Sequence, residues 1–516
     1  MINRRRFLTA LTSAAALPAL VKSEALEAPS TAESKAVLHS DPLRPQFHFL
    51  PPANWMNDPN GPIFWNGKYH MFYQFNPNGA FWGDMHWGHA VSDDMVHWKH
   101  LPIALAPTPG GPDSEGCFTG TAFTNGGKVH LMYTGVRSAT EDQATIKDGP
   151  HSLRESQCLA VSEDPELRRW HKTANPVIAN PPARVQVNGF RDPSPWRQGD
   201  WWYTVVGSGI ANEGGVTLLY RSKDLENWEF MHVLAQRSLG GSSGCGPVDP
   251  WEVWECPEFF ALGEWHVLIC STLGKAYWQC GKLDTHDMTF APEHIGILDY
   301  GSYYAPKTQL DEAGNRILWG WVQESRPLEE YKAAGWAGMM SLPRILTVTT
   351  EGRLRVEFAP QLRQLRQKEQ SIQLGDDEEA NRRNIGAMTY EGCCGEVLLT
   401  TRRPGGPFDV AIGGSGNANS PWLRIKYDPT AVSQVTVDAR PIPLQLKDGE
   451  NLDLHLYADG SVIELLVNGQ IAWTKRFYYS GPNAKDLKLR WSGSTASILR
   501  LSCWQISPIS NDRLTT

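Results

Sequence analysis

The fold is decided by the stretch Asn66-Gly67-Lys68-Tyr69-His70-Met71-Phe72-Tyr73-Gln74-Phe75, because its pattern returns four more times along the chain. A turn that contains glycine comes first, and a run rich in β-branched and aromatic residues follows it, as at the start of a β-strand. The other four copies are Gly126-Gly127-Lys128 before 129–136, Gln198-Gly199-Asp200 before 201–206, Leu262-Gly263-Glu264 before 265–271, and Ala313-Gly314-Asn315 before 316–322.

The spacing of these copies indicates an internal structural repeat. The glycines follow one another at intervals of roughly 50 to 70 residues, enough for a hairpin and outer strands in each unit. Behind the first three copies, a serine and an acid precede a tryptophan, at Trp98, Trp170 and Trp228. Five such units predict an all-β, five-bladed β-propeller over residues 41–350. A β-sandwich also uses hairpins, but it would not explain a repeat of this length.

Upstream of the first copy lies Trp55-Met56-Asn57-Asp58-Pro59-Asn60-Gly61, which taken alone is simply a good turn. The repeat changes this interpretation. Asp58, Asp192 and Glu255 lie seven to nine residues before the glycines of units one, three and four. We therefore expect the three acids at equivalent places at the start of each blade's first strand. Innermost strands line the channel of a propeller, so the carboxylates should converge on one axial pocket.

Like charges brought together raise each other's pKa, so a group of acids indicates chemistry. Arg191 precedes Asp192 and should keep that carboxylate ionised. Glu255 lies in Trp-Glu-Cys-Pro, an apolar setting that should raise its pKa and suit a proton donor. Asp58, beside two asparagines, can stay charged and attack. Two alternatives stay open: Arg191 and Asp192 could be an ordinary pair on a turn, and Glu258 could be the inward acid.

Four ordered motifs carry a resemblance to a known family: 55–61, Phe-Thr-Gly-Thr at 118–121, Arg-Asp-Pro at 191–193 and Trp-Glu-Cys-Pro at 254–257. Together they resemble glycoside hydrolase family 32, which contains the invertases, inulinases and levanases. The stretches 299–305 and 335–344 are similar to further motifs of that family. The resemblance runs from about Leu43 into the C-terminal part of the chain.

This resemblance implies that Asp58 is the nucleophile, Asp192 the transition-state stabiliser and Glu255 the acid/base. It also implies a fructosyl subsite lined by Asn57, Gln74, Trp82, Phe118, Thr119, Arg191, Tyr303 and Trp336. The chain departs from the family at Thr119 and Thr121, where serine is usual, and at Glu258, where aspartate is usual. Threonine keeps the hydroxyl, whereas the longer Glu258 could shift the orientation of Glu255.

The implied reaction is retaining hydrolysis of terminal β-D-fructofuranosyl units, from sucrose or from the fructans inulin and levan. A carboxyl separation of roughly 5 to 5.5 Å would accompany such a double displacement. The same intermediate also permits fructosyl transfer to a sugar acceptor. A carbohydrate-binding propeller without activity is the non-enzymatic alternative.

Beyond residue 350 the pattern changes. Residues 351–370 are expected to form a connector with a short helix that begins at Pro360. Alternating runs at 453–457 and 462–467, with hairpin signals at Asp459-Gly460 and Asn468-Gly469, predict a β-sandwich over 371–510.

The N-terminal end is typical of an exported protein. Residues 1–25 place three arginines before an apolar run and small residues, which resembles a twin-arginine export signal. The apolar run is too short for a membrane span, so the mature form should be periplasmic or extracellular and not membrane-bound. Residues 26–40 are expected to be a polar leader without pattern.

Composition excludes several classes of function. The chain has 516 residues and a net charge of -8 with no long basic run, which excludes nucleic acid as a partner. Nine cysteines are scattered without metal-ligand spacing, so neither a metal, another cofactor nor a disulfide framework is expected. The 21 tryptophans suit sheet packing and sugar stacking.

Overall fold

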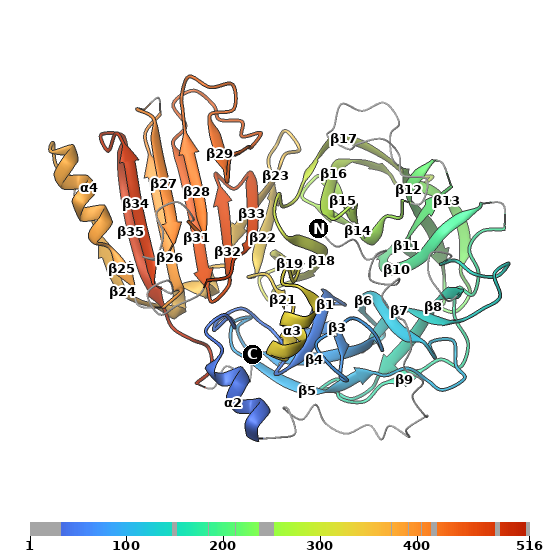
Figure 1. Ribbon diagram of the computed structural model, residues 1–516. Helices are drawn as coiled ribbons and strands as arrows, with labels where there is room; N and C mark the ends of the chain where they lie inside the picture. Colours follow the sequence, from blue (N-terminus) through green and yellow to red (C-terminus); the bar gives the residue numbers. More distant parts are fainter. Residues whose placement is uncertain are drawn as a thin grey trace.

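The computed structural model describes residues 32–146, 152–183, 185–211, 213–236, 252–372, 374–390, 392–403, 405–413, 421–479 and 486–511. Five sheets follow one another around a common axis, and two further sheets pack beside them (Figure 1). The predicted all-β architecture, a five-bladed propeller followed by a sandwich, is confirmed. The predicted signal at 1–25 lies outside the described residues.

Each blade is an antiparallel sheet whose strands run outward from the axis in chain order. Blade one comprises β1 (Asn54–Pro59), β3 (Lys68–Asn76), β4 (His86–Ser92) and β5 (Trp98–Leu105), with β2 (Ile63–Trp65) paired to β3. Blade two comprises β6 (Gly116–Asn125), β7 (Lys128–Ser138), β8 (Leu153–Ser162) and β9 (His171–Lys172). Blade three comprises β10 (Val187–Gln198), β11 (Trp201–Ile210), β12 (Gly214–Ser222) and β13 (Glu229–Gln236).

The last two blades complete the ring. Blade four comprises β14 (Glu255–Leu262), β15 (Trp265–Thr272), β16 (Lys275–Asp284) and β17 (Thr289–Ile297). Blade five comprises β18 (Tyr303–Leu310), β19 (Arg316–Val322), β22 (Arg344–Val348) and β23 (Leu354–Phe358). Between β19 and β22 lie α3 (Leu328–Ala334), β20 (Trp336–Ala337) and β21 (Met339–Met340), which pairs with β19.

The repeated glycine turn joins the first long strand of each blade to the second. In all five turns a glycine has a positive φ, between 60° and 84°, which side chains other than glycine rarely adopt. The strand after each turn begins within one residue of its predicted start. In the echoed turns behind units one to three, each tryptophan indole donates to the backbone oxygen three residues earlier, at Met95, Leu167 and Leu225.

The ring is closed by segments from its two ends. β1 pairs in parallel with β20, with Asn54 opposite Trp336, and the Asn54 amide donates to Gly335 O at 2.8 Å. The Met340 amide also donates to Phe49 O at 2.9 Å. The innermost strand of blade one is therefore held by residues that follow blade five.

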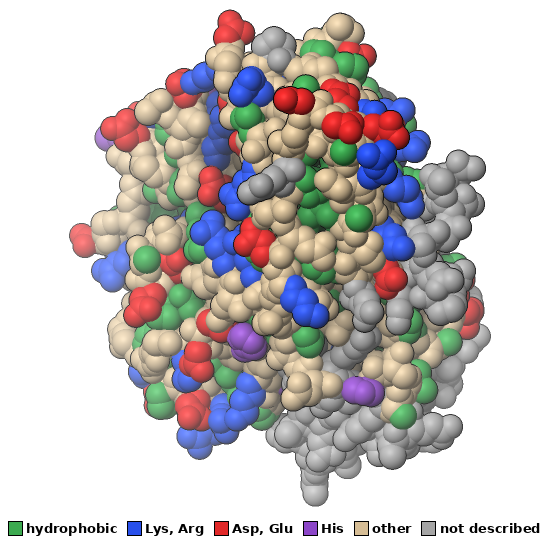
Figure 2. Space-filling view, turned by 90° about the vertical axis from the view of Figure 1, so that its left-hand side faces the viewer, with side chains coloured by type: hydrophobic (Ala, Val, Ile, Leu, Met, Phe, Trp, Pro, Cys, Tyr) green, Lys and Arg blue, Asp and Glu red, His purple; other side chains and the backbone are tan. Residues whose placement is uncertain are grey.

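The C-terminal domain is a sandwich of two six-stranded sheets. One sheet contains β24 (Arg366–Ser371), β35 (Ile498–Ile506), β26 (Cys394–Thr401), β31 (Leu452–Asp459), β32 (Val462–Val467) and β33 (Ile471–Arg476). The other contains β25 (Thr389–Tyr390), β34 (Leu487–Gly493), β27 (Phe408–Gly413), β28 (Leu423–Tyr427), β29 (Val435–Val437) and β30 (Arg440–Pro441). The helix α4 (Glu378–Ala387) packs beside β34 (Figure 1). On the face shown in Figure 2, acidic and basic side chains are interspersed.

Two boundaries differ from the predicted ones. The propeller extends past residue 350 to the end of β23, and β24 already belongs to the sandwich, so the predicted 351–370 connector shrinks to the 3-10 helix Pro360–Leu365. The expected patternless leader at 26–40 contains the helix α2 (Ala32–Ser40), whose Leu38 is buried with core residues of blade one. Tertiary contacts, which the local pattern does not encode, set both boundaries.

A buried charge cluster joins the two domains. Arg344 of blade five contacts Asp299 at 2.9 Å and Glu464 of β32 at 2.7 Å, and all three side chains are fully buried. His48 lies between Glu464, at 3.1 Å, and Asp459, at 2.8 Å. Burial alone would lower the pKa of His48, but the hydrogen bonds to these two carboxylates outweigh it and raise that pKa to about 9. The protonated imidazole thus links the propeller to the sandwich.

Candidate active site

The innermost strand of every blade has a register shift at a corresponding place. The pairing of this strand with its neighbour shifts register between Met56 and Pro59, Phe118 and Gly120, Arg191 and Ser194, Glu255 and Glu258, and Tyr304 and Lys307. Such β-bulges bend a strand and re-aim its side chains, and they are frequent beside active sites. Five bulges at the same stage of five inner strands place a ring of re-aimed residues around the axis.

The sequence predicts equivalent positions for the three acids, but they share only the region of the bulge and lie at different places in it. Glu255 is the last paired residue before its bulge, Asp192 is the first residue inside its bulge, and Asp58 is the second. In blade four the place of Asp192 is taken by Cys256, and both residues have a positive φ, 63° and 51°. Backbone strain of this kind at non-glycine residues concentrates at functional sites.

Asp58 and Asp192 converge on one residue, Cys256. The Cys256 thiol lies 3.4 Å from a carboxylate oxygen of each aspartate, and its backbone N–H donates to Asp192 at 2.8 Å. Asp58 also accepts from the Thr119 hydroxyl at 2.7 Å and from the Asn57 amide at 3.0 Å. The convergence predicted from the repeat is therefore present for these two acids, and donors on three sides fix the orientation of the Asp58 carboxylate.

Glu255 has polar partners rather than the apolar setting expected from its sequence neighbours. One carboxylate oxygen lies 3.4 Å from Arg191 Nη1, and the other accepts from the Tyr304 hydroxyl at 2.7 Å. The Trp254 indole turns away into the core between blades three and four, where it occupies the space that a side chain at Gly215 would need. Adjacent residues of a strand point to opposite faces, so the tryptophan does not cover the acid.

Arg191 links Glu255 to a fourth acid that the sequence did not single out. Its Nε lies 2.7 Å from the fully buried Glu155, which also accepts from the Thr145 hydroxyl at 2.9 Å and from the Phe190 amide at 2.7 Å. Burial raises the pKa of Glu155, and the neighbouring Arg191 opposes that rise. Glu155 thus anchors the guanidinium that faces Glu255. Glu155 lies in β8, the third strand of blade two, and no motif in the sequence marks it.

Of the other predicted subsite residues of blades one and two, Asn57 contacts Asp58 directly. The amide oxygen of Asn57 accepts from the Trp55 indole at 2.8 Å, and Gln74 donates to the Cys117 carbonyl at 2.9 Å, one residue before Phe118. Phe118 and Trp82 are partly buried and meet edge to face, with ring centroids 6.0 Å apart. Phe118 precedes Thr119 in the chain, and the two rings form an aromatic surface of the kind that packs against sugar rings.

Tyr303 and Trp336 are placed elsewhere. Tyr303 is fully buried beneath the Arg344 guanidinium, 4.7 Å from the ring centroid. The Trp336 indole is also buried, and its N–H donates to Asp41 at 2.7 Å. Within β18, the residue that reaches the acids is Tyr304, because a shift of one residue moves a side chain to the other face of a strand.

Glu258, the alternative inward acid, does not join the three others. It lies beyond the bulge, accepts from the Thr308 amide at 2.7 Å and lines a cavity further along the axis. Burial raises its pKa, although the Lys307 ammonium opposes the rise. Glu255 is therefore the blade-four acid that contacts Arg191 and Tyr304.

The described residues contain no group of three or more His, Cys, Asp or Glu side chains placed to hold a metal ion. Eight cysteines fall within the described ranges, and all are buried. Within the same part of the chain, no helix has the length and apolar character needed to cross a bilayer.

Comparison with known proteins identifies the family. Residues 48–357 match the glycosyl hydrolases family 32 N-terminal domain, and residues 361–505 match the family 32 C-terminal domain. A sucrose-6-phosphate hydrolase of Escherichia coli is 34% identical over 90% of this chain and 94% of its own length. A raffinose invertase of the same species is 32% identical over 93% of this chain and 98% of its length.

Solved structures agree with the sequence matches. A family 32 β-fructofuranosidase of Bombyx mori superposes with a TM-score of 0.73 at 29% identity, over 93% of this chain and 97% of that one. Fructan 1-exohydrolase IIa of Cichorium intybus gives a TM-score of 0.70 at 26% identity, over 90% and 98%. Both domain models match in order and together span nearly all of the described chain. The chain belongs to glycoside hydrolase family 32 and is a glycosidase of the β-fructofuranosidase type.

Proposed function

We propose that this enzyme releases terminal β-D-fructofuranosyl units from sucrose and short fructans with retention of configuration. The observation that carries the proposal is that Asp58 and Asp192 both contact Cys256. Glu255 immediately precedes Cys256 in β14. Hydrolysis by two carboxyl groups needs a fixed nucleophile and a separate proton donor, and these acids have different surroundings.

In the first step Asp58 attacks the anomeric carbon of the fructosyl unit. Hydrogen bonds from Thr119 and Asn57 orient the carboxylate before the substrate binds, so little orientational entropy is lost on binding. The bond to the departing oxygen breaks as Glu255 transfers its proton to that oxygen. The result is a covalent fructosyl-enzyme and a free leaving sugar.

In the second step Glu255, now ionised, removes a proton from water as the water oxygen attacks the same carbon. The bond to Asp58 breaks, fructose leaves, and Glu255 is again protonated. The Tyr304 hydroxyl and the Arg191 guanidinium hold the two oxygens of Glu255 in place for both transfers. Asp192 accepts from fructosyl hydroxyls and binds them more tightly as positive charge develops on the ring.

The substrate class is supported by relatives that contain bound sugars. A variant of the Bombyx mori β-fructofuranosidase has been solved with sucrose, and a variant of the Cichorium intybus exohydrolase with 1-kestose. We infer that sucrose and 1-kestose fit the site of this enzyme. Product analysis in concentrated sucrose separates hydrolysis, which yields glucose and fructose alone, from transfer, which also yields trisaccharides.

The decisive variant is Asp58→Asn, which keeps the size of the side chain and removes the nucleophilic charge. Sucrose hydrolysis should fall by several orders of magnitude, as it does when a covalent nucleophile is lost, while the melting temperature stays close to that of the parent. In the parent, NMR of the first-formed fructose should show the β-furanose. Appreciable turnover by the variant, or first-formed α-anomer, would overturn the proposal.

Export is a separate proposal, supported by the arginines and the apolar run of residues 1–25. Replacing Arg5 and Arg6 by lysine should leave the protein in the cytoplasm of a host with twin-arginine transport. Equal secretion of the substituted and parent chains would refute it.

A further inference from the structure

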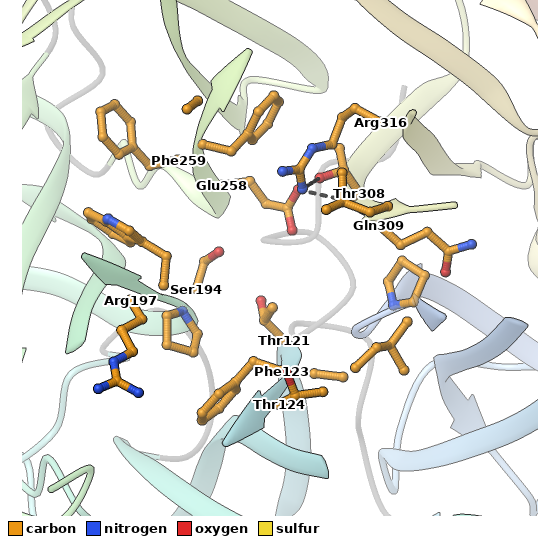
Figure 3. A pocket seen from close by; sticks show the side chains of 18 of the residues that line it. Thr121, Phe123, Thr124, Ser194, Arg197, Glu258, Phe259, Thr308, Gln309 and Arg316 are labelled. Carbon is orange, nitrogen blue, oxygen red and sulfur yellow. Dashed lines mark hydrogen bonds between the residues drawn. The ribbon is translucent and has the colours of Figure 1, made fainter. Parts of the chain in front are cut away.

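A cavity lies on the propeller axis beyond the bulges, at the end of the inner strands that carries the glycine turns. Its volume is about 780 Å³, within the range of small-molecule sites. All five blades contribute to it (Figure 3). Its inner walls come from residues two or three places after the bulge positions, such as Thr121, Ser194 and Glu258, and its rim comes from residues next to the five glycine turns, such as Gln198 and Asp311.

Lys307 separates this cavity from the acids. The side chain is fully buried, and its ammonium donates to the Thr121 hydroxyl and to the Pro257 carbonyl, each at 3.2 Å. These partners belong to blades two and four, so the lysine of blade five crosses the axis. The cavity is therefore a compartment distinct from the site of Asp58.

The floor of the cavity presents charges of both signs. Glu258 points toward the centre, and the Arg316 guanidinium lies beside it and donates to the Thr308 hydroxyl at 3.1 Å (Figure 3). Arg316 Nε is buried and has no hydrogen-bond partner in the part of the chain that the structure describes. The Thr121 and Ser194 hydroxyls also face the centre (Figure 3). The site thus offers a cationic donor, an anionic acceptor and neutral hydroxyls within one cavity.

This set of groups selects the class of ligand. An anion would meet the buried Glu258, and a cation would meet Arg316 and Lys307, so a net charge of either sign is opposed. A neutral molecule with several hydroxyls can donate to the carboxylate and accept from the guanidinium at once. Aromatic side chains around the cavity, Phe123, Trp196, Phe259 and Phe260 among them, suit the C–H faces of a sugar ring.

We propose that this cavity is a second carbohydrate site, which binds a mono- or disaccharide at the end of the propeller opposite the acids. The bound sugar would accept from Arg316 and donate to Glu258. Neither residue belongs to the catalytic machinery proposed above, so the site can exist whether or not that mechanism holds.

The test counts bound sugar on an Asp58→Asn background, in which substrate is not consumed. Isothermal titration with sucrose should reveal two classes of site, and a separate titration with glucose should reveal the cavity class. Arg316→Met should weaken one class at least about tenfold, which corresponds to one charge-assisted hydrogen bond. Ser194→Tyr, which fills the cavity, should abolish the same class.

Arg197→Met is the matched control. Arg197 lies at the rim and its side chain points away from the centre, so both classes should persist (Figure 3). Melting curves verify that each variant is folded. If Arg316→Met does not fold, Ser194→Tyr provides the test of the cavity. Identical titrations of the background, Arg316→Met and Ser194→Tyr would overturn the proposal, as would tighter binding of inorganic phosphate or Ca²⁺ than of either sugar to the same cavity. If the Asp58 mechanism fails and the background still hydrolyses sucrose, the glucose titration, in which no reaction occurs, still shows whether the cavity substitutions remove a class of site.

Discussion

Loss of the buried proton of His48 should make the stability of this enzyme fall at alkaline pH. The imidazole is fully buried between Asp459 and Glu464, and both ring nitrogens face carboxylate oxygens. A neutral ring donates through only one nitrogen, so deprotonation leaves one carboxylate facing a lone pair. The perturbation to compare is therefore His48→Gln, which has no proton to lose.

The magnitude follows from the pKa of His48. A rise from 6.5 to about 9 corresponds to roughly 3 kcal/mol, since each pH unit between the unfolded and folded pKa is worth about 1.4 kcal/mol. Because the folded pKa is the higher one, this stabilisation is complete below about pH 6.5. It declines between about pH 6.5 and 9 and is lost above about pH 9.

The assay is guanidinium unfolding of the parent and His48→Gln at about pH 6, 7.5 and 9.5. All other titrating groups are common to both chains, so the difference between their free energies of unfolding isolates His48. The advantage of the parent should shrink by roughly 3 kcal/mol from the lowest to the highest pH. His97→Gln is the control, since the His97 ring also contacts a carboxylate but is half exposed. A constant difference between parent and His48→Gln across this range would refute the reasoning.

Three further substitutions test other parts of the structure. Tyr304→Phe removes the 2.7 Å hydrogen bond to Glu255 and should lower kcat about tenfold with little change in KM; an unchanged pH–rate profile would contradict a role through Glu255. Arg344→Met leaves the buried Asp299 without its guanidinium and Glu464 with His48 as its remaining cation, so it should cost about 3 to 5 kcal/mol in guanidinium unfolding, and a loss below about 1 kcal/mol would disagree. Gly301→Ala puts a methyl carbon 1.7 Å from the Thr474 carbonyl of the sandwich, so the melting temperature should drop by several degrees, and an unaltered value would show that the interface can shift.

The fold could be predicted because its signals are local. A glycine in the left-handed region and an alternating strand after it are both readable within ten residues, and each of the five copies has them. The sandwich was predicted from hairpin signals of the same kind. Helix α2 and the early start of β24 were missed because contacts with distant segments stabilise them.

The site was predicted less completely, since one residue of offset matters in a strand. Counting from the glycines placed Asp58, Asp192 and Glu255 together, but could not resolve where each lies in its bulge. The same uncertainty selected Tyr303 in place of Tyr304. No local pattern encodes the burial of Trp336 against Asp41 or the contact of Arg191 with Glu155, because each joins segments far apart in sequence.

The closure of the ring by β1 and β20 has a consequence for biosynthesis. The partner of β1 lies about 280 residues later in the chain, so a ribosome has made most of the propeller before the first inner strand can be covered. Until β20 is made, the backbone N–H and C=O groups along one edge of β1 can pair with a strand of another chain. Pairing between segments so far apart in sequence is also slow. Chains that stop short of residue 340 are thus the species most exposed to aggregation, and a chaperone that protects the nascent N-terminal blade should raise the yield of the whole enzyme.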